Sequence, residues 1–283
     1  GEGRARASRA YPVGVSVDGE ALLRLSIFAG VLALLAVAEA IWPRRTLAFG
    51  RRRWLANLGL SVFNTAMLRV SYFLVPALSV FAALYAEGRG WGVLPAAGVS
   101  GWIGVVVAFL ALDLAIYAQH AAFHFVPPFW RLHRVHHADP DIDVTTAVRF
   151  HPIEILISQG WKIAVVLALG APVVAVVAFE IALNATAMFS HANLRVPLGV
   201  DRAVRSIFVT PDMHRIHHST QMAETNSNFG FNLSIWDRLF GTYRAQPAEG
   251  HLSMTIGLES YRNEAATQFA WLLRFPFLKG PVA

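Results

Sequence analysis

The sequence contains no cysteine and few charged residues. Without cysteine, disulfide bonds, iron–sulfur clusters and thiolate zinc sites are all excluded. Charged residues make up 15% of the 283 residues, against about 25% in soluble domains, whereas 55% of the residues are hydrophobic. This composition predicts an integral membrane protein in which one catalytic domain accompanies several spanning helices.

Acidic residues are fewer than basic ones, so the formal net charge is +6. We see no basic segment interleaved with aromatic residues, and we therefore attribute the excess to arginines that flank membrane helices rather than to nucleic-acid binding. The arginine run within residues 44–53 is the strongest positive-inside signal in the chain. It places this loop in the cytoplasm, and we expect the protein to lie in a bacterial inner membrane.

Long apolar runs predict an all-α fold of polytopic membrane helices with a histidine-rich helical cap on the cytoplasmic side. Residues 22–42 have spanning length and are interpreted as an uncleaved membrane helix, although arginines precede them as in a signal peptide. Residues 54–86 exceed one simple span and are interrupted by Arg69 and Pro76, so we expect part of this stretch to lie along the interface.

The next span covers residues 102–126, and two crossings would bring the histidines that follow it to the side of the arginine run. Residues 153–191 are interrupted at Gly170-Ala171-Pro172 and predict a helical hairpin with both ends on that side. We divide the chain into N-terminal membrane helices (1–101), a di-metal catalytic core that includes the hairpin (102–245) and an amphipathic C-terminal tail (246–283). Within this tail, the segment from about 268 to 278 is expected to rest on the membrane.

Histidine is concentrated in three clusters. The pattern H-x-x-H-H begins at His133 and again at His214, and H-x-x-x-H begins at His120. Positions i, i+3 and i+4 share one helix face, so each H-x-x-H-H is expected to present three imidazoles to one point. Eight nitrogen donors are too many for one metal ion and suit two. The predicted catalytic metal ligands are His120, His124, His133, His136, His137, His214, His217 and His218.

Imidazole alone does not name the metal, since it suits iron, zinc, copper and nickel. Three features favour a di-iron oxygenase. The number of ligands fits two ions, the clusters lie where apolar spans meet the cytoplasm, and no glutamate follows the first histidine as in the H-E-x-x-H motif of zinc peptidases. The position of the site suits a lipid substrate.

The order of the three histidine clusters resembles that of the fatty acid hydroxylase/sterol desaturase superfamily of membrane di-iron enzymes. The resemblance runs from about residue 102 to 245. It is supported by Asp113-x-x-x-Tyr117-x-x-His120, Arg149-Phe150-His151-Pro152-Ile153-Glu154, His191-Ala192-Asn193, Thr210-Pro211-x-x-His214, Asn228-Phe229-Gly230 and Trp236-Asp237-Arg238-Leu239-Phe240-Gly241-Thr242.

The resemblance implies O₂-dependent oxidation of a C–H bond at two iron ions, with His191 as a ninth metal ligand. Electrons would come from a separate donor, such as a ferredoxin, a cytochrome or a reductase, because the chain shows no flavin-binding or haem-binding segment. Cytoplasmic arginines at 131, 134, 202 and 205 would dock an acidic donor or contact lipid headgroups. Zinc is expected in purified samples, since it binds such sites more tightly than Fe(II).

Several polar residues are candidates for holding the imidazoles through their second ring nitrogen. These are Asp113, Tyr117, His151, Asp212 and Asp237, together with Glu154. For the carboxylates, plain salt bridges with Arg134, Arg149, Arg215 or Arg238 are an equal alternative. His151 precedes a proline and suits helix capping as well, and Asn184 suits an intramembrane hydrogen bond better than a metal. His251 lies outside the clusters and is expected at the surface.

The main hypothesis is a lipid hydroxylase that acts on an acyl chain or a related lipid. A sterol or carotenoid desaturase or oxidase would use the same ligand set. A metal-binding membrane protein without redox chemistry, such as a transporter, and a hydrolase with a zinc-bound water are the alternatives from other classes. Substrate, regiochemistry, choice between hydroxylation and desaturation, donor and oligomeric state stay open at this stage.

Overall fold

The computed structural model describes residues 17–74 and 79–279, and within them it is helical and contains no β-strand. This confirms the all-α prediction. The helices are α1 (Val17–Ile41), α2 (Trp54–Leu74), α3 (Ser79–Arg89), α4 (Val93–Ala96), α5 (Gly101–Phe125), α6 (Pro127–His137), α7 (Pro152–Leu169), α8 (Val173–His191), α9 (Leu198–Val204), α10 (Pro211–His217), α11 (Met222–Thr225), α12 (Ile235–Leu239) and α13 (Phe269–Arg274). Short 3₁₀ turns are η1 (Gly50–Arg53), η2 (Val144–Val148), η3 (Glu259–Tyr261), η4 (Glu264–Thr267) and η5 (Phe275–Phe277).

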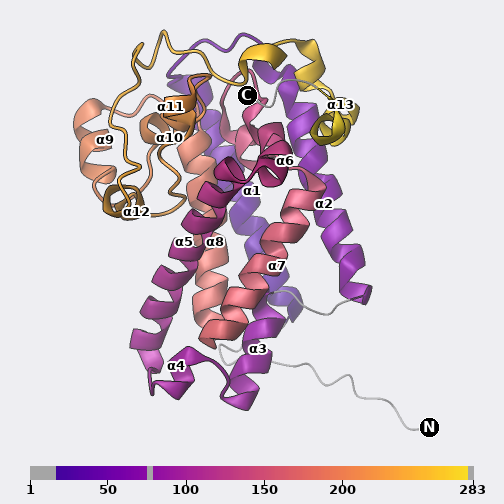
Figure 1. The fold of residues 1–283 in the computed structure, drawn as a ribbon, viewed down its shortest axis with the longest axis vertical. Helices are drawn as coiled ribbons and strands as arrows, with labels where there is room; N and C mark the ends of the chain where they lie inside the picture. The colour runs from indigo at the N-terminus through magenta and orange to yellow at the C-terminus, as the bar shows by residue number, and fades with distance from the viewer. Residues whose placement is uncertain (1–16, 75–78, 280–283) are drawn as a thin grey trace.

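Four of the described helices are long and apolar enough to cross a membrane: α1, α5, α7 and α8. They run side by side through the lower two thirds of Figure 1, and the short helices α6 and α9 to α12 gather at the upper end. Helices α3, α5, α7 and α8 share one buried apolar cluster, which includes Leu112, Val166 and Phe179. The prediction of an integral membrane protein is therefore confirmed.

The predicted hairpin is formed by α7 and α8, and its turn depends on Gly170. This residue has a φ of 64°, and a Cβ atom there would lie 2.1 Å from the carbonyl oxygen of Trp91. Only glycine tolerates both conditions. Within the bilayer, Glu180 on α8 accepts a hydrogen bond from Lys162 Nζ on α7 (2.6 Å) and pairs with Arg24 on α1. These charged side chains are stabilised by pairing with one another, as expected for charged residues in a spanning bundle.

The stretch 54–86 forms two helices, α2 and α3, separated by residues 75–78. The expected interruptions at Arg69 and Pro76, and the arginines before residue 10, lie outside the side chains that the structure describes. Helix α2 begins at the histidine end of the bundle, where it packs on α13. Helix α3 packs on α7 and α8 at the far end (Figure 1).

The arginine run and the histidines lie at the same end of the bundle, as the two-crossing argument predicts. Arg44 N donates a hydrogen bond to the carbonyl oxygen of Asn193 (2.9 Å), two residues after the end of α8. Arg53 Nη1 donates to Asp139 Oδ2 (2.6 Å), two residues after α6. The loop after α1 is thus attached to the segments that carry histidine.

The C-terminal tail covers α2 and α6. Leu272 and Phe275 are fully buried in one apolar cluster with Leu60 of α2 and Trp130 of α6. The buried face of the tail therefore packs on α2 and α6, and contact of its exposed face with the membrane stays a prediction.

Candidate metal centre

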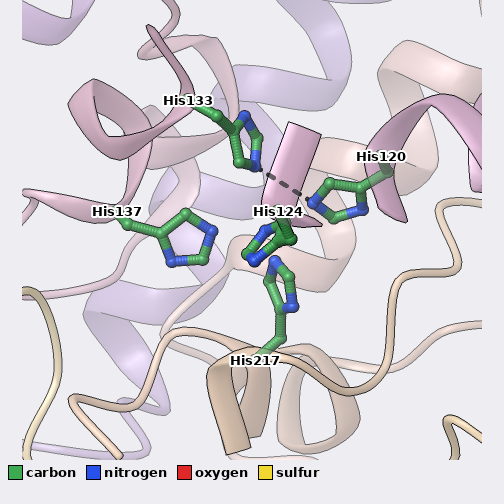
Figure 2. A group of neighbouring side chains, drawn as sticks. All are labelled: His120, His124, His133, His137 and His217. Carbon is green, nitrogen blue, oxygen red and sulfur yellow. Dashed lines mark hydrogen bonds between the residues drawn. The ribbon is translucent and has the colours of Figure 1, made fainter. Parts of the chain in front are cut away.

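Nine histidines meet at the upper end of the bundle, in two groups of buried side chains. In each group the candidate ligand atoms all lie within 4.8 Å of one another. The five-histidine group, drawn in Figure 2, consists of His120, His124, His133, His137 and His217. The four-histidine group consists of His136, His191, His214 and His218. The structure thus brings together all eight predicted ligands and the implied ninth, His191.

Each H-x-x-H-H motif contributes to both groups, so the expectation that its three imidazoles meet at one point is wrong. His133 and His137 enter the five-histidine group, and His136 enters the other. In the second motif the roles reverse, since His214 and His218 enter the four-histidine group and His217 the five-histidine group. With about 100° of rotation per residue, positions i and i+4 are close in direction, whereas i+3 points to the other side of i. The i, i+4 pair therefore stays together and the third imidazole diverges.

The two groups are in contact with each other. The rings of His137 and His218, one from each group, stack with centroids 4.6 Å apart. The rings of His136 and His137 have centroids 5.4 Å apart. Two ions bound by these groups would consequently be neighbours, as in sites where two metals act on one substrate.

Four ligand candidates have a backbone carbonyl or carboxylate oxygen 2.6 to 2.8 Å from Nδ1, and a fifth, His124, has the amide oxygen of Asn226 at 3.3 Å. His120 Nδ1 donates to the carbonyl oxygen of Phe229 (2.7 Å), and His217 Nδ1 donates to that of Ser227 (2.8 Å). His191 Nδ1 donates to that of Ala187 (2.6 Å). Carbonyl oxygens only accept, so these three imidazoles carry their proton on Nδ1 and a lone pair on Nε2. The fourth is His133, whose Nδ1 donates to Glu154 Oε1 (2.6 Å). This pattern is typical of metal-binding histidines.

The Nε2 atoms converge on one another. Those of His120 and His133 are 3.1 Å apart (dashed line in Figure 2), and His191 Nε2 lies 3.1 Å from that of His136 and 3.0 Å from that of His214. Both nitrogens of the first pair carry lone pairs, which repel each other unless a cation lies between them. Two nitrogens bound about 2.1 Å from one ion at about a right angle would be about 3.0 Å apart. The donor set therefore fits a metal ion in each group.

Burial also keeps the imidazoles neutral. Loss of hydration lowers the pKa of His133 to about 3, and burial followed by the neighbouring histidines lowers the pKa of His137 and His217 well below the usual value. The same causes act on His136, His214 and His218. Neutral imidazole is the form that binds metals, so the dry surroundings favour cation binding over protonation.

Among the predicted supporting carboxylates, Glu154 contacts a ligand candidate directly, through His133. Asp237 acts one step away: its carboxylate accepts the backbone N–H groups of Phe229 (2.7 Å) and Gly230 (2.9 Å), and the Phe229 carbonyl meets His120. Asp237 therefore positions the loop that orients His120.

Asp113 and Tyr117 hold this same loop from helix α5. Asp113 accepts hydrogen bonds from Asn232 Nδ2 (2.8 Å) and Trp236 Nε1 (2.8 Å), and the Tyr117 hydroxyl pairs with Thr242 Oγ1 (2.9 Å). Neither set of contacts involves a histidine. We expected these two side chains to contact an imidazole. Instead, they anchor the segment that wraps the site.

Asp212 forms salt bridges, which was the alternative to the expected role of holding an imidazole ligand. It forms a two-pronged pair with Arg44 (3.0 Å for both bonds) and also binds Arg215. His251 lies 3.7 Å from Asp212 and is 7% exposed, so its expected surface position is wrong. Burial lowers the pKa of His251 to about 4. The fold of the tail buries this residue, and no local sequence pattern predicts that fold.

His151 and Asn184 were each expected either to support the metal site or to have a purely structural role, and both have the structural role. His151 Nδ1 accepts the N–H of Ile153 (3.2 Å) and so caps α7. Asn184 Nδ2 donates to the carbonyl oxygen of Glu180 (2.8 Å), which is the expected intramembrane hydrogen bond. Neither belongs to a histidine group.

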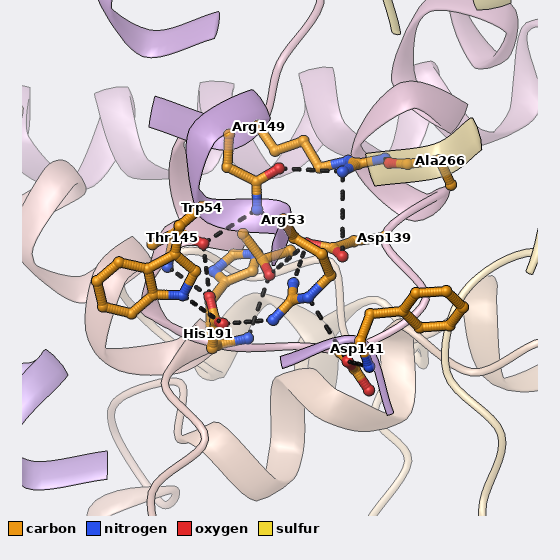
Figure 3. Close-up of polar contacts among 12 residues, drawn as sticks. Arg53, Trp54, Asp139, Asp141, Thr145, Arg149, His191 and Ala266 are labelled. Atoms are coloured by element: carbon orange, nitrogen blue, oxygen red, sulfur yellow. Dashed lines mark hydrogen bonds and ion pairs between the residues drawn. The ribbon is translucent and has the colours of Figure 1, made fainter. Parts of the chain in front are cut away.

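A buried ionic network beneath the four-histidine group was missed by sequence reasoning. Arg53 is fully buried, donates to Asp139 (2.6 Å), also pairs with Asp143 and lies 3.5 Å from Asp141 (Figure 3). Its position in the arginine run indicated only a cytoplasmic loop that flanks a membrane helix. The spacing Asp139-x-Asp141-x-Asp143 directly after the first H-x-x-H-H was the available signal. The network ties the start of α2 to the segment that follows α6.

Part of the chain matches a known protein family. Residues 105–242, just under half of the chain, match the family described as fatty acid hydroxylase. This region is similar to a fatty acid hydroxylase domain. This confirms the superfamily resemblance, and the matched residues include all nine histidines of the two groups. Within this region the histidine clusters point to a metal-dependent oxygenase.

The relatives that the chain resembles are lipid enzymes. It is 32% identical over 143 residues to ornithine lipid hydroxylase OlsE of Rhizobium tropici, which covers 50% of this chain and 42% of that protein. It is 33% identical over 140 residues to alkylglycerol monooxygenase of Homo sapiens, covering 49% of this chain and 30% of the relative. The chain thus spans less than half the length of these relatives. No solved structure matches it.

Proposed function

We propose that this protein is an integral-membrane, di-iron, O₂-dependent monooxygenase that hydroxylates an acyl chain or a related lipid. The observation that carries the proposal is the convergence of nine neutral, buried imidazoles into two adjacent groups within the region that matches the fatty acid hydroxylase family. The names of the two relatives, a lipid hydroxylase and a monooxygenase, support the substrate class and the reaction type.

The five-histidine group holds one ion and the four-histidine group holds the other. When bound, the pair of ions supplies O₂-dependent oxidation of a C–H bond, with electrons from a separate donor. His120, His133, His191 and His217 keep their lone pairs directed at the ions because carbonyl or carboxylate oxygens hold the opposite ring nitrogen. Glu154 also raises the basicity of His133, which strengthens its hold on the cation.

Aromatic side chains exclude water around the histidines. Phe150 stacks on His136 with ring centroids 4.5 Å apart, and Phe231 lies 4.8 Å from His120. Trp130 also lies against the histidines, with its ring centroid 5.0 Å from that of His124. A dry wall of this kind would keep water from the bound ions and suits the hydrocarbon part of a lipid.

The catalytic core comprises residues 102–245, preceded by the N-terminal membrane helices (1–101) and followed by the tail (246–283). We place the histidine end at the cytoplasmic face of a bacterial inner membrane, because the arginine run lies at that end and follows the positive-inside rule. A soluble ferredoxin, cytochrome or reductase would deliver electrons on this side.

The test is turnover by the purified full chain after metal removal and reloading with Fe(II). The reloaded protein is incubated with isotopically labelled O₂, a ferredoxin with its reductase, and a panel of membrane lipids. Mass spectrometry should find a lipid that has gained one labelled oxygen atom. The metal-free protein should give no such product.

Other outcomes would assign another reaction. Loss of two hydrogens without oxygen gain would identify a desaturase, and turnover without O₂ by the zinc-loaded protein would identify a hydrolase. Metal uptake into vesicles without chemical turnover would identify a transporter. Each of these results overturns the hydroxylase proposal.

A further inference from the structure

A cavity of about 670 Å³ opens at the end of α1, and its lining reaches Asn193, two residues after His191. Ala36, Glu39 and Ala40 of α1 form one side, and the loop with Arg44 and Arg45 forms another. Because α1 is a spanning helix and the arginine loop directly follows it, the cavity lies where the hydrocarbon of the bilayer gives way to lipid headgroups. Trp42, 60% exposed at the end of this helix, is typical of that level.

Three arginines line the cavity: Arg44, Arg45 and Arg51. The two carboxylates in its wall are already engaged. Glu39 Oε2 accepts the backbone N–H groups of Val144 (3.1 Å) and Asn193 (2.9 Å). Asp143 pairs with Arg53 and accepts from Trp54 Nε1 (3.0 Å). The wall therefore presents more positive charge than its own acids neutralise.

The three arginines differ in how many of their N–H groups already have hydrogen-bond partners. Arg44 is bound through two hydrogen bonds to Asp212. Arg45 Nη2 donates to the carbonyl oxygen of Met254 (2.7 Å), but its Nη1 is buried and has no hydrogen-bond partner among the described residues. Arg51 lies over the ring of Trp54, 5.5 Å from its centroid, with its side chain exposed. A buried donor without a partner is costly, so Arg45, which lines the cavity, keeps donor capacity that no described residue uses.

We propose that this cavity binds the phosphate of a membrane lipid headgroup, with Arg45 as the main donor and Arg51 as a second cation. Several guanidinium groups around one cavity suit a group with more than one anionic oxygen, and arginine is the preferred side chain for that geometry. The apolar wall of Ala36 and Ala40 provides the path for the attached acyl chains.

The cavity wall is joined to the segments that carry the four-histidine group. Asn193, two residues after His191, receives the backbone N–H of Arg45 on its Oδ1 (3.0 Å), and Arg44 holds Asp212, two residues before His214. A lipid held here would contact Asn193, two residues after His191. The binding itself does not depend on the reaction that the centre performs.

The experiment measures lipid binding to the full, delipidated chain by native mass spectrometry in detergent. The probes are dioleoyl phosphatidic acid and dioleoylglycerol, which share their acyl chains and differ in the phosphate. We expect phosphatidic acid to bind at least about tenfold more tightly, the effect of hydrogen bonds to a charged group. Equal affinity for the two lipids would overturn the proposal.

Two matched pairs of variants locate the site. Ala40→Glu adds a carboxylate to the cavity wall, and Ala40→Gln adds the same bulk without charge. Arg45→Gln removes the donor, and Arg52→Gln removes a neighbouring arginine that does not line the cavity and is 78% exposed. We expect the first member of each pair to lose about tenfold in affinity for phosphatidic acid, with the second within about twofold of the unmodified protein.

A loss in Arg52→Gln as large as in Arg45→Gln, or wild-type binding by Ala40→Glu, would overturn the assignment. Thermal melting checks that each variant is folded, and the Ala40 pair decides the outcome if Arg45→Gln fails to fold. Inorganic phosphate is titrated separately. Binding of inorganic phosphate as tight as that of phosphatidic acid would identify a soluble anion and overturn the lipid assignment.

Discussion

At the scale of single residues, Glu154 has the most specific relation to the candidate centre. It lies in the first turn of α7, is 3% exposed and receives the Nδ1 proton of His133. A carboxylate in this position fixes the ring orientation and increases the electron density on the opposite nitrogen. Helix α7 thereby couples the spanning hairpin to the five-histidine group.

Replacing Glu154 with Gln should weaken metal binding by about 10- to 100-fold, the usual effect of losing such a partner. Gln can still accept the proton of His133, so the fold should persist while the charge is lost. Metal content after dialysis against graded chelator concentrations measures the change. Glu264→Gln, at a side chain that is 77% exposed, is the control and should match the unmodified protein. Unchanged metal retention in Glu154→Gln would reduce Glu154 to a packing role.

Individual ligands can be tested against a histidine that belongs to neither group. His136→Ala and His217→Ala each remove one donor from a different group, and we expect each to lower the metal content by about one ion per chain and to abolish activity. His151→Ala loses a helix cap instead, which costs about 1 kcal/mol and should leave the metal content intact. Elemental analysis of the purified variants distinguishes the cases, and full metal content in both ligand variants contradicts the assignment.

At the scale of elements, the segment from Asn226 to Tyr243 behaves as a strap over the histidines. Its carbonyl groups at Ser227 and Phe229 orient His217 and His120. Two buried carboxylates, Asp113 from α5 and Asp237 from the strap itself, accept its N–H groups. Residues 226–234 of the strap form no helix or strand, so these carboxylates provide partners for the buried backbone N–H groups there.

Replacing Asp237 with Ala should destabilise the protein by about 3 kcal/mol, since it leaves the buried N–H groups of Phe229 and Gly230 without their acceptor. Metal retention should fall as well, because the Phe229 carbonyl would no longer hold His120. Thermal melting and elemental analysis report the two effects. Glu180→Ala, at a carboxylate paired with Lys162 in the spanning hairpin, should lower the melting temperature without loss of metal. A stable variant with full metal content would show that the strap positions itself without Asp237.

At the scale of the whole molecule, the fold concentrates neutral imidazoles in a dry interior, and this makes its stability depend on pH. Burial holds the pKa of His133 at about 3 and that of His137 well below the usual value near 6.5. Below pH 6.5 the unfolded chain takes up protons that the folded, metal-free chain does not. The free energy of unfolding therefore decreases as the pH falls, down to the pKa of the folded state.

Each such histidine should contribute roughly 1.4 kcal/mol of destabilisation per pH unit below 6.5. The metal-free protein should thus lose thermal stability steeply between pH 7.5 and 5 and show little change above pH 7.5. The metal-loaded protein should resist this until protons displace the ions, after which the two melting curves coincide. Melting followed by tryptophan fluorescence tests the prediction, and a flat profile for the metal-free form would contradict it.

The spanning helices, the hairpin, the cap at Thr210 and the histidine motifs were all predictable from the sequence, because apolar length, helix periodicity and capping preferences act over neighbouring residues. Only the tertiary structure decided how each H-x-x-H-H divides between two groups, that Glu154 meets His133, and that Arg53 and His251 are buried. These outcomes depend on which helix faces meet across the bundle. Residues distant in the chain set that arrangement through packing, and no local pattern records it.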